Sequence, residues 1–143
     1  NARWILPKNE WGNFRMELSG TYIAESSFIN STGVYVDSDG EYSQPLLRGS
    51  ATLAWNKGDW AASLFVNYIG AYNDAFQASK IDDQYIVNPQ VSYKGWYHST
   101  ITVGVRNILN SAPPIDLSDS KLVNENTNWT EPAFVYVRIS KDW

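Results

Sequence analysis

The segment from Leu47 to Tyr72 constrains the fold most strongly, because its side chains alternate in kind with a period of two. Successive side chains of a β-strand point to opposite faces, so this alternation predicts strands with one apolar and one polar face. The pattern is interrupted at Asn56-Lys57-Gly58-Asp59, which supplies the Gly and Asp of a short hairpin turn. The predicted apolar face comprises Leu47, Gly49, Ala51, Leu53, Trp55, Trp60, Ala62, Leu64, Val66, Tyr68 and Tyr72. The segment therefore predicts a hairpin of two long amphipathic strands.

Aromatic residues mark both ends of this apolar face. Trp55 and Trp60 lie beside the turn, and Tyr68 and Tyr72 lie at the far end. Strands that span a membrane carry an apolar band about ten residues long with aromatic residues at both water interfaces. The aromatic residues expected at such interfaces are Trp55, Trp60, Trp96, Trp143, Tyr68 and Tyr72. The hairpin is thus typical of a transmembrane β-barrel.

The same alternation recurs on both sides of the hairpin. The predicted strands are a stub at 3–6, followed by 13–24, 46–56, 60–73, 85–94, 99–110 and 133–143. Pro89 lies inside one of them and removes one donor from the strand ladder, which argues against that strand.

Short and long connections alternate along the chain. The short connections are near 8–12, 57–59 and 95–98, and the long ones are at 25–45, 74–84 and 111–132. A barrel between two aqueous compartments has tight turns on one side and longer loops on the other. The sequence therefore predicts an all-β fold, an antiparallel up-and-down meander of about six strands that is a slice of a large transmembrane β-barrel.

Composition excludes several other classes. The 143 residues contain no Cys, which excludes a disulfide framework and a thiolate metal site. A net charge of −4 and a pI of about 4.8 argue against a nucleic-acid partner. Asn1-Ala2 is interpreted as the scar of a removed tag, so that 3–143 form the barrel segment.

Three stretches resemble the C-terminal part of a TonB-dependent outer-membrane receptor. They are Leu53–Trp60 with Asn67–Tyr72, then Val103–Asn110 followed by Pro113-Pro114, and the terminal Phe134–Trp143. With the strand at 13–24 they follow the order of that family over nearly the whole chain. Pro89 and a final Trp, where Phe is commoner, depart from the family pattern.

The resemblance implies a localisation and a set of partners. Such receptors lie in the outer membrane of Gram-negative bacteria and take up scarce nutrients such as iron chelates, cobalamin or carbohydrates. Their energy comes from TonB, which acts through a segment ahead of an N-terminal plug. This chain would contain neither that segment nor the plug, would contact outer-membrane lipid and the rest of its barrel, and would transport no nutrient alone.

Charged residues occupy the predicted polar strand faces. In a barrel these residues would line the lumen and contact the plug or a passing solute. They are Arg15, Glu17, Arg48, Lys94, Arg106 and Arg138.

The sequence predicts no catalytic, cofactor or metal site. His98, the single His, lies in a short turn without a Cys or a second His nearby. Asp82 and Asp83 are adjacent and therefore point to opposite sides. The run Asp37-Ser38-Asp39-Gly40-Glu41 resembles the start of a calcium loop, but its Gly is two positions early, so it is interpreted as an acidic turn.

One alternative has a different function, a soluble β-sandwich module that binds carbohydrate through its aromatic side chains. A lectin would gather these in one set of loops, whereas Trp55, Trp60, Trp96 and Trp143 gather at the short-turn side, which favours a membrane girdle. If the barrel interpretation holds, an isolated fragment has open strand edges and a large apolar face. We therefore expect it to self-associate.

Overall fold

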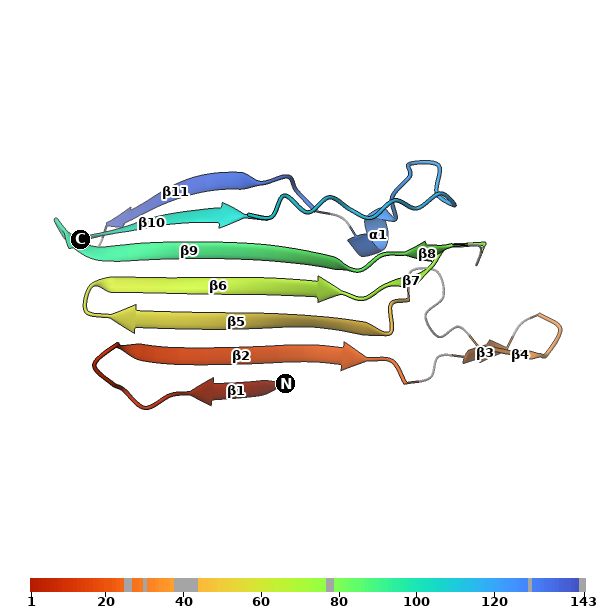
Figure 1. Cartoon of the computed structure of the whole chain (residues 1–143), viewed down its shortest axis with the longest axis horizontal. Helices are drawn as coiled ribbons and strands as arrows, with labels where there is room; N and C mark the ends of the chain where they lie inside the picture. Colours follow the sequence, from red (N-terminus) through yellow and green to blue (C-terminus); the bar gives the residue numbers. More distant parts are fainter. Residues whose placement is uncertain (25–26, 30, 38–43, 77–78, 129, 142–143) are drawn as a thin grey trace.

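The computed structural model describes residues 1–24, 27–29, 31–37, 44–76, 79–128 and 130–141. Within these residues seven strands form one antiparallel sheet in the order β1-β2-β5-β6-β9-β10-β11 (Figure 1). They are β1 (Ala2–Ile5), β2 (Asn13–Tyr22), β5 (Leu47–Lys57), β6 (Trp60–Ile69), β9 (Gln84–Trp96), β10 (Ser99–Arg106) and β11 (Phe134–Lys141). Each pairs with the next sheet strand along the chain. The predicted all-β antiparallel meander is confirmed, with β1 as its stub.

The register of the sheet agrees with the faces predicted from the sequence. Leu53 of β5 lies opposite Met16 of β2 and Leu64 of β6, so these three apolar side chains share one face. Thr52, the neighbour of Leu53, pairs with Phe65 and lies on the other face. A shift of one residue would have moved every side chain to the opposite face.

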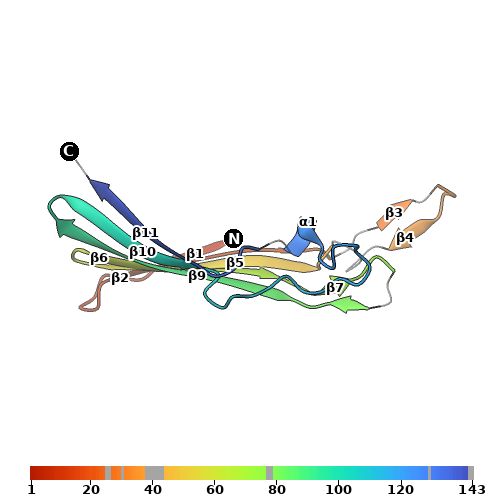
Figure 2. The same ribbon diagram turned by 90° about the horizontal axis from the view of Figure 1, so that it is seen from above.

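The two ends of the sheet differ in their connections. One end, called the turn end below, carries the short connections 6–12, 58–59 and 97–98; Gly58 has a φ of 56° there. The other, the loop end, carries the connections 23–46, 70–83 and 107–133. Figure 2 shows the sheet nearly edge-on, with β10 and β11 rising out of the plane of the other strands toward the turn end.

The long connections contain short elements of their own. A hairpin of β3 (Ser27–Ile29) and β4 (Tyr35–Asp37) lies in the first, and β7 (Tyr72–Asn73) pairs with β8 (Lys80–Ile81) in the second. The third contains one helical turn, α1 (Glu125–Asn128). Figure 1 places all of these beyond the loop end of the sheet.

β6 and β10 end four residues earlier than the alternation predicts. β6 stops at Ile69 because β5 begins at Leu47: the N–H of Gly70 still donates to the carbonyl of Leu47 at 2.8 Å in the same register, and no residue of β5 lies beyond it. β10 stops at Arg106 because Asn107 adopts a φ of 48°, which no extended strand accommodates. The alternation of apolar and polar residues continues past both strand ends in the sequence, so it does not show where the strands stop.

Pro89 lies within β9, opposite Leu64 of β6. The ladder between β9 and β10 reaches Gln90, which pairs with Gly104, and goes no further. Pro89 therefore lies where β9 pairs with β6 alone. The missing N–H donor is compatible with the strand at this position.

Buried apolar side chains gather at the loop end. Among the described residues Ile69, Tyr72 and Ile81 form the hydrophobic core. The long central strands contribute few fully buried side chains, because no second layer covers the sheet in the described part of the chain.

Candidate functional site

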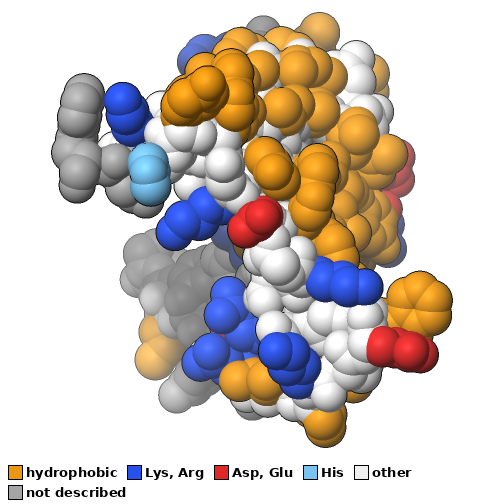
Figure 3. Space-filling view, turned by 90° about the vertical axis from the view of Figure 1, so that its left-hand side faces the viewer, with side chains coloured by type: hydrophobic (Ala, Val, Ile, Leu, Met, Phe, Trp, Pro, Cys, Tyr) orange, Lys and Arg blue, Asp and Glu red, His pale blue; other side chains and the backbone are white. Residues whose placement is uncertain are grey.

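One face of the sheet, called the apolar face below, is lined by hydrophobic side chains from all seven strands. The exposed fraction is 45% for Leu53, 48% for Val103 and 63% for Val137, far above that of core residues. Figure 3 looks at the turn end and shows hydrophobic side chains over one side of the molecule and a group of Lys and Arg side chains on the other. The large side chains of the apolar face are Trp4, Phe14, Met16, Leu18, Tyr22, Leu47, Leu53, Trp55, Trp60, Leu64, Val66, Tyr68, Tyr85, Val87, Val91, Tyr93, Ile101, Val103, Val105, Val135, Val137 and Ile139.

Aromatic pairs stand at both ends of the apolar face. Trp60 and Tyr93 face each other at the turn end with ring centroids 4.8 Å apart. Tyr68 and Tyr85 do the same near the loop end, also at 4.8 Å. Eight residues separate Trp60 from Tyr68 on β6, a distance of about 27 Å along the strand. The apolar face is therefore a band with a ring pair at each border.

The other predicted girdle residues lie in different surroundings. Trp55 is half-buried on the apolar face, and its indole N–H donates to the carbonyl of Trp11 at 2.7 Å. Trp96 is exposed at the turn end beside Tyr97, with ring centroids 6.0 Å apart. Trp143 lies outside the described residues.

The expectation that Tyr72 lies on the exposed apolar rim is wrong. Tyr72 is only 1% exposed and belongs to β7, which follows the end of β6 at Ile69. Its hydroxyl lies 2.5 Å from Oδ1 of Asn128 in α1, to which it donates. The alternation of apolar and polar residues continues in the sequence past Ile69, where β6 ends, and therefore predicts the wrong position for Tyr72.

The opposite face, called the polar face below, carries the charged side chains predicted for it. The register places Arg15, Glu17, Arg48, Lys94, Arg106 and Arg138 there, opposite residues such as Ala54, Thr52, Thr21, Thr100, Phe134 and Thr102. That this face lines a lumen stays a prediction.

Glu17 is the carboxylate shared by two arginines on this face. Its Oε1 lies 3.2 Å from Nε of Arg3 and 3.5 Å from Nε of Arg15, and all three side chains are about half exposed. Arg3 was not among the predicted polar-face residues, although it stands one residue from Trp4 in the alternation of β1. At this exposure water screens the two ion pairs, so they contribute little stability.

Tyr136 lies on the polar face directly over Gly104. Its hydroxyl donates to Oε1 of Gln90 at 3.0 Å, reaching across β10 from β11 to β9. A Cβ at Gly104 would collide with the ring of Tyr136. A glycine is therefore required at position 104, because any side chain there would displace this ring.

At the loop end two connections pack together through a buried polar network, called the loop cap below (residues 70–84 and 107–131). Asn128 accepts from Tyr72 and donates through Nδ2 to Oε1 of Gln84 at 3.3 Å. Gln84 in turn donates through Nε2 to the carbonyl of Ala112 at 3.2 Å. The side chains of Tyr72, Gln84 and Asn128 are almost fully buried, so the bonds of Asn128 to Tyr72 and to Gln84 are shielded from water.

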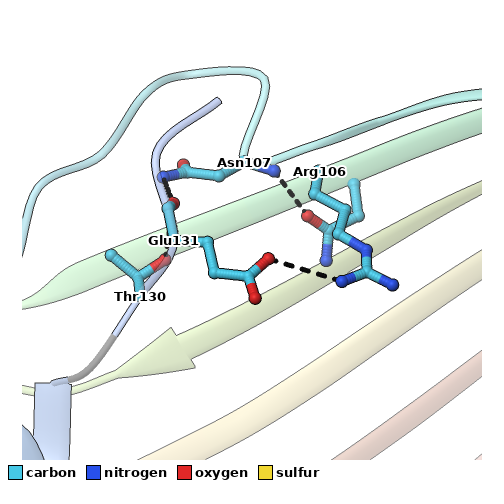
Figure 4. A network of polar contacts seen from close by, with 5 residues as sticks. Arg106, Asn107, Thr130 and Glu131 are labelled. Atoms are coloured by element: carbon cyan, nitrogen blue, oxygen red, sulfur yellow. Dashed lines mark hydrogen bonds and ion pairs between the residues drawn. The ribbon is translucent and has the colours of Figure 1, made fainter. Parts of the chain in front are cut away.

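Asn107 fastens the loop cap to the sheet (Figure 4). Its backbone N–H donates to Oδ1 of Asn88 in β9 at 2.7 Å, and its Nδ2 donates to the carbonyls of Ser111 at 2.9 Å and Glu131 at 2.8 Å. Beside it, Arg106 Nη1 lies 3.4 Å from Oε2 of Glu131. Sequence analysis missed Asn107; its signal is an Asn at the end of a β-pattern, since Asn tolerates a positive φ.

The chemical candidates stay apart in the structure. His98 is exposed in the turn after β9 with a φ of 58°, and Asp82 and Asp83 are exposed between β8 and β9. The described residues contain no group of three or more His, Cys, Asp or Glu side chains placed to hold a metal ion. Most of the run 37–41 lies outside the described residues.

Comparison of the chain with protein-family models, with curated proteins and with solved structures found no match. Among the described residues no helix has the length and hydrophobicity needed to cross a membrane.

Proposed function

We propose that the chain is part of the barrel wall of a TonB-dependent receptor in the outer membrane of a Gram-negative bacterium. The observation that carries the proposal is the apolar face, which runs without interruption over seven strands and is open to its surroundings. A face of this size is far larger than the apolar patches of soluble monomers. Lipid chains would cover it.

The dimensions of the apolar face fit this role. The band between the two ring pairs is about 27 Å long, and a strand tilted by about 40° would cross about 20 Å of membrane over this length. Transmembrane barrels have apolar bands of about 25 Å with aromatic girdles at both borders. Trp60 with Tyr93, and Tyr68 with Tyr85, would stand at those borders.

The difference in length between the connections at the two ends of the sheet supports an orientation of the chain in the membrane. In outer-membrane barrels the short turns face the periplasm and the long loops face the exterior. The loop cap would then lie outside the cell. The motif Val103–Asn110 followed by Pro113-Pro114, which resembles that family, spans the junction between β10 and the loop cap.

In the proposed function this chain supplies wall and outer loops and has no activity by itself. The nutrient would belong to the iron-chelate, cobalamin or carbohydrate class, and TonB would act through a part of the receptor ahead of the barrel. A soluble β-sandwich would instead need a second sheet over the apolar face. Besides the main sheet, the described residues form only the β3-β4 and β7-β8 hairpins, both at the loop end.

The absence of Cys allows a direct test by single labels. Leu64→Cys places a label on the apolar face midway between Trp60 and Tyr68, and Ser63→Cys places it on the opposite face one residue away. Each variant carries an environment-sensitive fluorophore and is folded into lipid vesicles. We expect lipids brominated in mid-chain to quench the label at 64 and water-soluble iodide to quench the label at 63. Equal quenching by both agents at both sites would refute the proposal.

A further inference from the structure

One row of paired residues on the polar face carries two phenylalanines, although most side chains of this face are charged, polar or small. Phe65 of β6 pairs with Asn88 of β9, and Phe134 of β11 pairs with Arg106 of β10. Asn88 and Arg106 lie two residues beyond the last pair of the β9-β10 ladder and line the same hollow. These four residues, called the aromatic row below, thus lie side by side on four neighbouring strands. The strands of the two rings are about 14 Å apart.

Both rings of the aromatic row are accessible from the polar side of the sheet. The exposed fraction is 38% for Phe65 and 54% for Phe134. Neither ring stacks on another aromatic ring among the described residues. A few polar groups beside accessible apolar surface are the usual composition of a small-molecule site.

The ion pair of Arg106 with Glu131 forms a shared wall of two hollows between and beside the rings. One hollow, of about 270 Å³, includes Asn88, and the other, of about 400 Å³, includes Phe134. The two charged side chains are 58% and 60% exposed, and only Nη1 of Arg106 and Oε2 of Glu131 face each other, at 3.4 Å (Figure 4). Nε and Nη2 of Arg106, Oε1 of Glu131 and Nδ2 of Asn88 have no partner among the described residues. The hollows therefore present donors and an acceptor side by side.

We propose that the aromatic row, together with Glu131, binds a neutral oligosaccharide. The inference rests on the proposed function and narrows its nutrient to the carbohydrate class. A paired guanidinium and carboxylate have no net charge, so a charged chelate would meet one like charge for each opposite one. A hydroxyl group both donates and accepts. Neighbouring hydroxyls of a sugar would accept from Nη2 of Arg106 and donate to Oε1 of Glu131, and hydrogen bonds to charged groups are the stronger kind.

The two phenylalanines supply the apolar part of the site. The face of a phenyl ring is electron-rich, so the C–H groups on one side of a sugar ring would pack on Phe134, and those of a second sugar on Phe65. Since the two rings stand on strands about 14 Å apart, a chain of linked sugars would contact both and a single sugar only one.

The test measures binding of neutral oligosaccharides of glucose, galactose, mannose or xylose by titration calorimetry. The chain is kept in an amine-oxide detergent, which has no sugar headgroup. Phe134→Leu removes the ring and keeps an apolar side chain, and Glu131→Gln removes the charge and keeps the shape. We expect each to bind the preferred sugar about fivefold more weakly, with unchanged circular dichroism. The matched controls are Phe14→Leu on the apolar face and Glu125→Gln in α1, neither of which lines the hollows, and the change expected in them is less than about twofold.

Three results would overturn the proposal. The first is that no oligosaccharide of the panel binds to the unmodified chain. The second is an equal loss of binding in the site variants and in their controls, which would place the sugar elsewhere. The third is that ferric citrate displaces the sugar or binds in its place, which would assign the aromatic row to an iron chelate. The label experiment at residues 63 and 64 is independent, so a failure there with intact sugar binding would refute the membrane role and not the oligosaccharide site.

Discussion

The sheet and the loop cap are stabilised in opposite ways. The sheet has two open faces, and side chains such as Leu53, Val103 and Val137 are about half exposed or more. The loop cap buries polar side chains, Gln84, Asn107 and Asn128 among them, and satisfies them with one another. The loop cap therefore has internal contacts of its own, whereas in the proposed function the apolar face of the sheet would be covered by lipid.

The largest effect is expected when a charge is placed on the apolar face. Leu64→Arg places a charge at the middle of the apolar band and should destabilise the lipid-inserted chain by about 2–4 kcal/mol. Ser63→Arg, one residue away on the polar face, should cost less than about 1 kcal/mol. Urea titration of the vesicle-bound chain measures both. If both substitutions lowered the free energy of unfolding by similar amounts, the two faces would not lie in different surroundings.

The second effect concerns the interior of the sheet. Gly104→Ala forces a methyl group into the ring of Tyr136 and should destabilise the sheet by about 1–3 kcal/mol. At Gly20 a Cβ would meet only the carbonyl of Arg48, at 3.6 Å, so Gly20→Ala should have little effect. Equilibrium unfolding in detergent compares them. Tyr136→Ala should rescue Gly104→Ala, and the absence of rescue would contradict the assigned contact.

The third effect loosens the loop cap while the sheet stays intact. Tyr72→Phe removes the donor to Asn128 and leaves a buried acceptor unpaired, at a cost of about 1–2 kcal/mol. Hydrogen exchange should accelerate at amides of 107–128 and remain unchanged in β5 and β6. Tyr97→Phe is the control, because Tyr97 is 78% exposed. Faster exchange throughout the sheet would show that the two regions are one cooperative unit.

The smallest effect is expected on the polar face. Glu17→Gln abolishes the shared ion pairs with Arg3 and Arg15, which lie at half-exposed side chains, and should change stability by less than about 1 kcal/mol. Thermal unfolding at low and high salt measures it, and the difference from the unmodified chain should shrink as salt is added. A large effect that persists in high salt would show that these charges are shielded from water.

The sheet could be predicted from the sequence and the loop cap could not, for a physical reason. The face on which each side chain lies and the register of the strands follow from a period of two, which can be seen in neighbouring residues such as Leu53 and Thr52. The loop cap depends on bonds between residues far apart in the chain, such as Gln84 to Ala112 and Tyr72 to Asn128, and these leave no period. The misplacement of Tyr72 and the late ends of two predicted strands arise after Ile69 and at Asn107, where the pattern continues in the sequence but the strands end.

The junction beside Pro89 has a consequence for motion. The β9-β10 ladder stops at Gln90. Beyond it the side chain of Asn88 accepts from Asn107, and the N–H of Ile108 donates to Val87. Gln84 at the start of β9 also donates to Ala112 and accepts from Asn128. All of these links can open without breaking the ladder between Ser99 and Gly104. We expect residues 107–128 to move away from β9 on the microsecond-to-millisecond scale while the strands stay in place, as segments with low local stability do. In the proposed receptor, a solute arriving from the loop end would contact this mobile segment before it reaches the sheet.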